Sequence, residues 1–103
     1  MHVARAFVHQ AEFEAAVAKA AQRLSPCVVS LMPAVEDDWS GDPAVFFTVV
    51  LKDEVNPESL FRVTNEVRDT IESDVAPREE WGVLPYFSFR SESEQARIEA
   101  TAA

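Results

Sequence analysis

The stretch from Asp37 to Lys52, DDWSGDPAVFFTVVLK, places a polar turn directly before the most hydrophobic segment of the chain. Gly41 supplies the backbone freedom that a tight reversal needs, and the ring of Pro43 fixes its φ angle and ends the turn. The residues from Ala44 onward are mainly β-branched or aromatic, as in a largely buried strand. This stretch therefore predicts a tight turn that feeds a core strand.

Side chains alternate between the two faces of a strand. One face of this strand takes Phe47, Val49 and Leu51, and the other takes Phe46, Thr48, Val50 and Lys52. The second set is the more mixed in polarity, so we expect it to face outward.

Two longer segments have helical periodicity. The first is an alanine-rich segment from Ala11 that stops at Ser25 and Pro26, with an apolar side made of Phe13, Val17, Ala20 and Leu24. The second begins at Asn56, a cap residue, followed by Pro57 at the first helical position. Its apolar stripe is Leu60, Val63, Val67, Ile71 and Val75.

Two further strands and a final helix complete the pattern. Residues 27–32 predict a strand that forms a hairpin with the core strand across a long acidic connection, residues 33–43. Residues 83–90 predict a third strand, and Pro85 favours an edge position because it lacks an N–H. Ser91 and Glu94 have capping-box spacing, which predicts a short helix through about Glu99.

The predicted order is α-β-β-α-β-α, an α+β fold with a three-stranded sheet and helices on one face. Residues 1–103 are expected to form a single domain, with residues 1–10 and 100–103 weakly ordered. The other sheet face is too aromatic to be left in water without a reason. By strand alternation it would carry Phe46, Thr48, Val50, Leu84, Tyr86, Ser88 and Arg90.

Composition and charge narrow the class of function. The 103 residues include 18 acidic and 9 basic side chains, for a net charge of −9, which disfavours nucleic acid as a partner and suits a basic protein. No apolar run approaches the length of a membrane span, no signal peptide is evident, and there is one cysteine. We therefore expect a cytoplasmic protein that does not enter a membrane.

The sequence offers little for catalysis. Cys27 would need a base held within hydrogen-bonding reach, and the two histidines, His2 and His9, lie in the lead-in. The two glycines, Gly41 and Gly82, do not form a phosphate-binding loop, and paired metal-ligand spacing is absent. We predict no catalytic residue, no resident metal and no cofactor, and we lean toward a protein that is not an enzyme.

One alternative uses the acidic turn. Glu36, Asp37, Asp38 and Asp42 could offer oxygen ligands to a hard cation, and Arg90 could complete a small metal-dependent enzyme. Their spacing differs from that of a calcium loop, so a solvated turn is the simpler interpretation.

A second alternative comes from the element order, which resembles the K-homology RNA-binding arrangement in outline. The chain lacks the GXXG loop of that arrangement, and its charge has the wrong sign for RNA.

Two segments, residues 38–47 and 86–96, join aromatic side chains to small polar and charged ones at strand ends. Tryptophan, tyrosine and arginine are enriched where binding energy concentrates. The candidate partner-binding residues are Trp39, Asp42, Phe46, Tyr86, Arg90, Ser91 and Glu94. The competing interpretation is structural: Trp39 would cover an end of the core, and Arg90 would pair with an acid of the turn.

In these two segments, DWSGDPAVFF and YFSFRSESEQ, the chain resembles an uncharacterised group of small acidic bacterial proteins. Their shared motifs are D-W-[ST]-G-[DE]-P-A-[IV]-F-F and Y-F-[SN]-F-R-S-x-S-E-Q. Members of this group occur beside small toxin-like proteins, often of the HEPN class, so the resemblance implies an antitoxin-like role. It spans roughly Asp38 to Ala96, and it transfers no catalytic residue.

Together these features predict a non-enzymatic, acidic protein-binding module that neutralises a basic partner. A homodimer that covers the apolar sheet face is the remaining alternative, because self-association also covers such a face.

Overall fold

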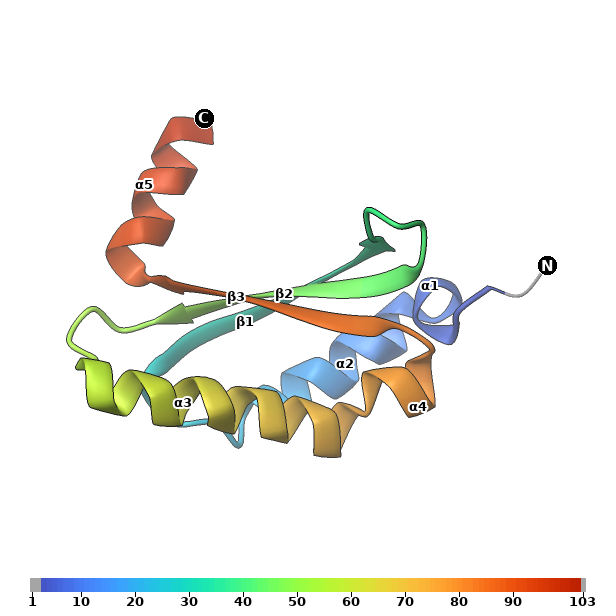
Figure 1. The fold of residues 1–103 in the computed structure, drawn as a ribbon, viewed down its shortest axis with the longest axis horizontal. Helices are drawn as coiled ribbons and strands as arrows, with labels where there is room; N and C mark the ends of the chain where they lie inside the picture. The colour runs from blue at the N-terminus through green and yellow to red at the C-terminus, as the bar shows by residue number, and fades with distance from the viewer. Residues whose placement is uncertain (1–2, 103) are drawn as a thin grey trace.

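The computed structural model describes residues 3–102, and it has a three-stranded sheet with most of its helices packed against one face (Figure 1). The elements are α1 (Arg5–Val8), α2 (Gln10–Ala21), β1 (Val28–Asp37), β2 (Pro43–Leu51), α3 (Pro57–Thr70), the π-helical turn η1 (Ile71–Val75), α4 (Pro77–Trp81), β3 (Leu84–Ser91) and α5 (Glu92–Ala102). The predicted α+β class and three-stranded sheet are confirmed. The short helices α1 and α4 were not predicted.

The sheet has the order β1-β2-β3, with β1 antiparallel to β2 and β2 parallel to β3. The predicted hairpin is therefore confirmed, but β1 is longer than expected and continues through Pro33 to Asp37. An edge strand tolerates a proline because one side of it makes no ladder hydrogen bonds. The long connection that we predicted shrinks to a tight turn at residues 38–42.

The core lies between β2 and the helices. Val45, Phe47 and Val49 of β2 are fully buried on the face that we predicted to point inward. The helices contribute buried side chains from the predicted stripes, namely Phe13, Val17 and Ala20 of α2, Val63 and Val67 of α3, and Ile71 and Val75 of η1. Leu60 differs from the prediction, since it remains 41% exposed in the first turn of α3.

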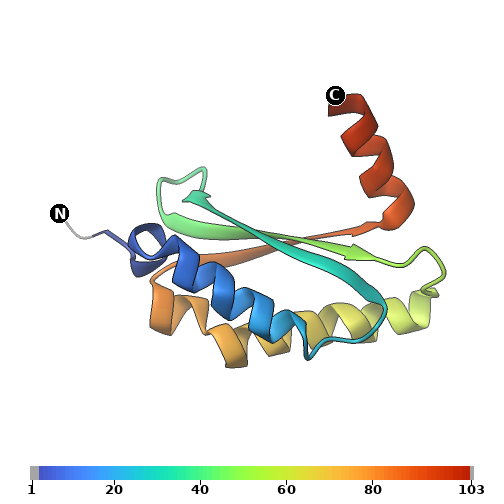
Figure 2. The same ribbon diagram turned by 180° about the vertical axis from the view of Figure 1, so that it is seen from behind.

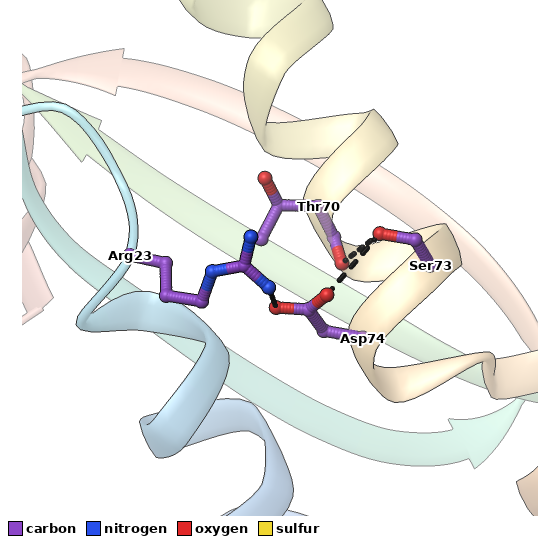
Figure 3. A network of polar contacts seen from close by, with 4 residues as sticks. All are labelled: Arg23, Thr70, Ser73 and Asp74. Atoms are coloured by element: carbon purple, nitrogen blue, oxygen red, sulfur yellow. Dashed lines mark hydrogen bonds and ion pairs between the residues drawn. The ribbon is translucent and has the colours of Figure 1, made fainter.

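Helix α3 continues directly into the π-helical turn η1, where the helical pitch changes. The N–H of Ala76 donates to the carbonyl of Ile71, five residues earlier, at 3.0 Å, and this π-type turn keeps both Ile71 and Val75 buried. Arg23, just beyond α2, donates to Asp74 Oδ2 at 2.7 Å (Figure 3). This bond joins the ends of the two long helices. The hydroxyl of Ser73 contacts the Thr70 carbonyl and Asp74 Oδ1 within the same helical segment (Figure 3).

The N-terminal segment includes a short helix. Arg5–Val8 form α1, and Ala4 and Ala6 are buried. The Arg5 guanidinium lies 4.4 Å from the centre of the Trp81 ring, which is a cation–π contact with α4. A helix this short has no sequence period to detect. The remaining part of the expected weakly ordered ends, residues 1–2 and 103, lies outside the described residues.

We expected the helices to lie on one face of the sheet, and the position of helix α5 shows that this prediction was wrong. This helix leaves the end of β3 and projects on the side of the sheet away from α2 and α3 (Figures 1 and 2). It also includes residues 100–102, which we expected to be weakly ordered. The radius of gyration is 14.2 Å, whereas a compact domain of this length has about 13 Å, which agrees with a projecting helix.

Ala76 is a site where glycine should improve the fold. It has φ 51° and ψ 63°, a left-handed conformation that costs a residue with a Cβ about 1–2 kcal/mol. We expect Ala76→Gly to raise the free energy of unfolding by up to about 1 kcal/mol, because relief of that strain outweighs the greater entropy of the unfolded chain.

The matched control is Ala18→Gly, at an exposed position inside α2, which should lower the free energy of unfolding by about 1 kcal/mol. Urea unfolding measures both variants. A loss of stability in Ala76→Gly equal to that in the control would contradict the assignment.

Candidate functional site

We call the sheet face opposite α2 and α3 the open face. It consists of four cross-strand rows, Glu36–Ala44–Leu84, Ala34–Phe46–Tyr86, Met32–Thr48–Ser88 and Ser30–Val50–Arg90. Strand alternation predicted the members from β2 and β3 except Ala44. Of the β1 members, Ala34 and Glu36 were missed because we ended that strand at Met32, and the sequence analysis assigned Ser30 and Met32 to no face. Ala44 and Val50 are buried, whereas Met32, Ala34, Glu36 and Ser88 are exposed.

An aromatic cluster lies at the turn end of the open face. The rings of Phe46 and Tyr86 stack with their centres 5.1 Å apart and an interplanar angle of 16°. Trp39 adds a third ring, 5.2 Å from Tyr86 and tilted by 55°. The Trp39 side chain is nevertheless 82% exposed. The interpretation that Trp39 covers the core is therefore wrong, and Trp81, edge-on to Phe13 at 5.2 Å, has that role instead.

Asp38 holds this end of the sheet together. Its Oδ1 accepts hydrogen bonds from the Ser40 hydroxyl at 2.7 Å, the Ser40 N–H at 2.9 Å and the Asp42 N–H at 3.0 Å. Its Oδ2 accepts from the Tyr86 hydroxyl at 2.9 Å. One carboxylate thus closes the β1–β2 turn and links it to β3. Asp38 is only 8% exposed.

These donors determine the charge of the site. The Ser40 hydroxyl above all, and then the N–H of Asp42 and the Tyr86 hydroxyl, hold the pKa of Asp38 below its ordinary value of 3.8, although burial opposes them. The same hydrogen bond to Asp38 raises the pKa of Tyr86 above 10.0, and burial and the charges of Asp38 and Asp42 act in the same direction. The Asp38 carboxylate therefore stays ionised and Tyr86 stays neutral at physiological pH.

Asp38 was not among the predicted site residues, although the sequence around it contains a pattern that favours such a turn. Aspartate followed by a small polar residue two positions later favours a side-chain-closed turn. We selected Asp42 instead. Asp42 contributes its N–H to the turn and its Oδ2 accepts from the Ser40 hydroxyl at 3.3 Å, while its side chain is exposed.

The other three predicted residues lie at the opposite end of β3. Arg90 is four residues from Tyr86 along the strand, or about 13 Å, so it does not pair with the acidic turn. Its guanidinium donates to Gln95 Oε1 of α5 at 3.0 Å. The structure therefore separates the seven predicted residues into a turn cluster and a group at the base of α5.

The group at the base of α5 fixes how that helix begins. The Ser91 hydroxyl accepts from the Glu94 N–H at 3.1 Å, and Glu94 Oε1 accepts from the Ser91 N–H at 3.2 Å, so the predicted capping box is confirmed. Asp53, which we did not predict, accepts from the Ser93 hydroxyl at 2.6 Å and from the Ser93 N–H at 3.0 Å. The Ser93 hydroxyl, first of these donors, holds the pKa of Asp53 below its ordinary value of 3.8.

Next to this group, a pocket of about 220 Å³ opens between the end of the sheet and α3. Its apolar wall is made by Leu51, Val55, Leu60 and Phe89, and its polar rim includes Arg90, Ser91 and Glu94.

The alternative function, a metal-dependent enzyme, would require the acidic side chains of the turn to lie close enough together to bind one cation. Glu36 lies on the open face, the Asp38 carboxylate accepts four hydrogen bonds, and Arg90 is at the far end of β3. Within residues 3–102, no three histidine, cysteine or acidic side chains come together in an arrangement that could hold a metal ion. The structure thus does not bring together the residues that this alternative needs.

Among the helices formed by residues 3–102, none is sufficiently long and apolar to span a bilayer. No protein-family model matches the sequence, and no curated protein or solved structure is significantly similar to it.

The bond between Asp38 and Tyr86 can be tested by titration, because the chain contains one tyrosine. We expect the phenolate absorbance to rise with a midpoint above 10, and we expect Asp38→Asn to move that midpoint downward, because the acceptor loses its charge. Asp53→Asn is the matched control at the other end of β3 and should leave the midpoint unchanged. Equal midpoints in all three proteins would show that the bond does not form in solution.

Acid stability follows from the two lowered pKa values. Asp38 and Asp53 have folded-state pKa values below the ordinary 3.8, so their contribution to stability is complete above that value and is lost as the pH falls through the folded-state values. Asp53→Asn should reduce the free energy of unfolding at pH 7 and should lose less stability than the natural protein on acidification.

The control is Glu54→Gln, at the neighbouring exposed acid, which we expect to follow the natural protein. Urea midpoints measured between about pH 6 and pH 3 give the comparison. An acid profile of Asp53→Asn that runs parallel to that of the natural protein would contradict the role of this carboxylate.

Proposed function

We propose that this protein is a non-enzymatic protein-binding module that docks a basic partner protein on its open face. The observation that supports this most strongly is Trp39, which is 82% exposed although it packs on Tyr86. A large aromatic side chain that is held in place but left in water is typical of the centre of a binding surface.

The surroundings of the aromatic cluster favour a basic partner. Glu36, Asp37 and Asp42 are exposed around the turn, and the chain has a net charge of −9. Such a field accelerates encounter with a positively charged protein, and the aromatic contacts then slow its dissociation. The same charge opposes face-to-face pairing of two copies, so we favour a different protein over a homodimer.

The antitoxin-like role belongs to this proposal. It rests on the motif resemblance, whose two segments supply the Trp39 turn and the junction of β3 with α5. In this proposal the module would act in the cytoplasm by covering the functional surface of a basic toxin-like protein.

The test is to produce the protein together with the product of the adjacent gene and to analyse the mixture by size-exclusion chromatography. We expect one peak that contains both chains. Trp39→Ala should weaken the complex by at least about 10-fold, since a central tryptophan commonly contributes 2 kcal/mol or more.

Phe61→Ala is the matched control, because Phe61 is 73% exposed on α3, away from the open face. It should leave the affinity within about twofold of the natural value. Two separate peaks at micromolar concentration, or equal effects of the two substitutions, would count against the proposal.

A further inference from the structure

We infer that the open face receives an amphipathic, lysine- or arginine-rich helix of the partner, laid along the strands between the β1–β2 turn and α5. This inference rests on the proposed function and adds the chemistry and the secondary structure of the segment that is bound.

The layering of the fold favours a helix as the occupant. The β2–β3 pair is parallel, and parallel strands are normally covered on both faces, usually by helices. In this chain α2 and α3 cover one face of the sheet (Figure 2). The other face keeps Phe46, Thr48 and Tyr86 partly exposed. A helix from another protein would supply the missing third layer.

The dimensions of the face also match one helix. Three strands spaced about 4.8 Å apart present a face roughly 10 Å wide, close to the 10–12 Å diameter of a helix with its side chains. The nine residues Pro43–Leu51 of β2 extend for about 30 Å, which is the length of a helix of about 20 residues.

The middle and the ends of the face differ in polarity. The middle rows are uncharged and contain Met32, Thr48 and Ser88, and Met32 is 43% exposed. Acids lie at both ends, with Glu36, Asp37 and Asp42 at the turn and Glu92, Glu94 and Glu99 on α5. The cation of the open face at the α5 end, Arg90, is hydrogen-bonded to Gln95 and is outnumbered there by these acids. This distribution suits a helix with an apolar stripe against the sheet and basic side chains that reach both ends.

Helix α5 forms a wall at one end of this site. Gln95 lies toward the open face, since its side chain accepts from Arg90. Ile98 is one turn further along the same side of α5 and is 44% exposed. A helix that ends against this wall would cover the exposed part of Ile98.

The experiment uses three synthetic peptides of about 20 residues, which is the length that matches the face. The first carries leucines along one side of a helix and lysines on the other, the second replaces the lysines with glutamates, and the third has the composition of the first without an apolar side. Isothermal titration calorimetry at two salt concentrations measures the binding of each to the natural protein.

We expect the first peptide to bind with a micromolar Kd that weakens with salt, and we expect the other two to bind at least about 10-fold more weakly. Met32→Lys and Ile98→Lys should each weaken binding of the first peptide by at least about 10-fold, because both place a like charge on its path. Phe61→Lys makes the same change of charge on α3 and should alter Kd by less than about twofold.

Circular dichroism verifies that each variant is folded, and Ser88→Lys on the exposed part of β3 replaces Met32→Lys if that variant is not. Equal binding of the first and third peptides, or equal effects of the three lysine substitutions, would overturn the inference. So would a dimer of the natural protein that Met32→Lys dissociates, because the open face would then belong to a second copy.

The two proposals can fail separately. If the product of the adjacent gene binds in a Trp39-dependent manner but the first peptide does not bind, the helix inference is wrong and the proposed function stands. If the peptide binds as expected but that gene product does not, the docking surface stands and this candidate partner is rejected.

Discussion

The central position of β2 is the constraint on which the rest of the structure depends. Both other strands pair with it, and its inward side chains Val45, Phe47 and Val49 are the middle of the core. Because its two faces must meet different environments, every second residue of β2 is committed to the helices and the residues between them to the open face. A slip of one residue in register would exchange the two sets.

The hydrogen bonds of Asp38 turn this scaffold into a defined surface. The carboxylate joins the β1–β2 turn to Tyr86 on β3, so Trp39, Phe46 and Tyr86 are held together although they come from three different elements. A surface organised before binding loses less conformational entropy when a partner arrives. This is the physical reason why a closed turn with an exposed tryptophan supports a binding role better than a mobile loop would.

Much of the fold follows from local sequence patterns. The apolar stripes of α2 and α3, the Asn56 cap and the Ser91–Glu94 capping box are contained within single segments, and each was predictable for that reason. Strand β1 continues through Pro33 although we predicted its end there, because proline is excluded only from strands that are paired on both sides. The direction of α5 depends on contacts between distant residues, among them Asp53 with Ser93.

The candidate site was predictable only in part, for the same reason. Alternation along β2 and β3 identified Phe46, Tyr86 and Arg90 as sharing one face, but it carries no information about their spacing or partners. The pairing of Arg90 with Gln95 instead of an acid of the turn, and the burial of Asp38, follow from the parallel alignment of β2 and β3. That alignment is a tertiary property.

Helix α5 has a thermodynamic consequence of its own. Its hydrogen bonds to the rest of the chain are made from its first turn, by Ser93, Glu94 and Gln95, and the turns that follow extend away from the sheet (Figure 1). Their helicity is therefore governed by the helix–coil equilibrium of a short segment, which is marginal in water. Heating should consequently melt this segment gradually, ahead of the cooperative unfolding of the sheet and its helices, so that far-ultraviolet circular dichroism and tryptophan fluorescence would report different transitions.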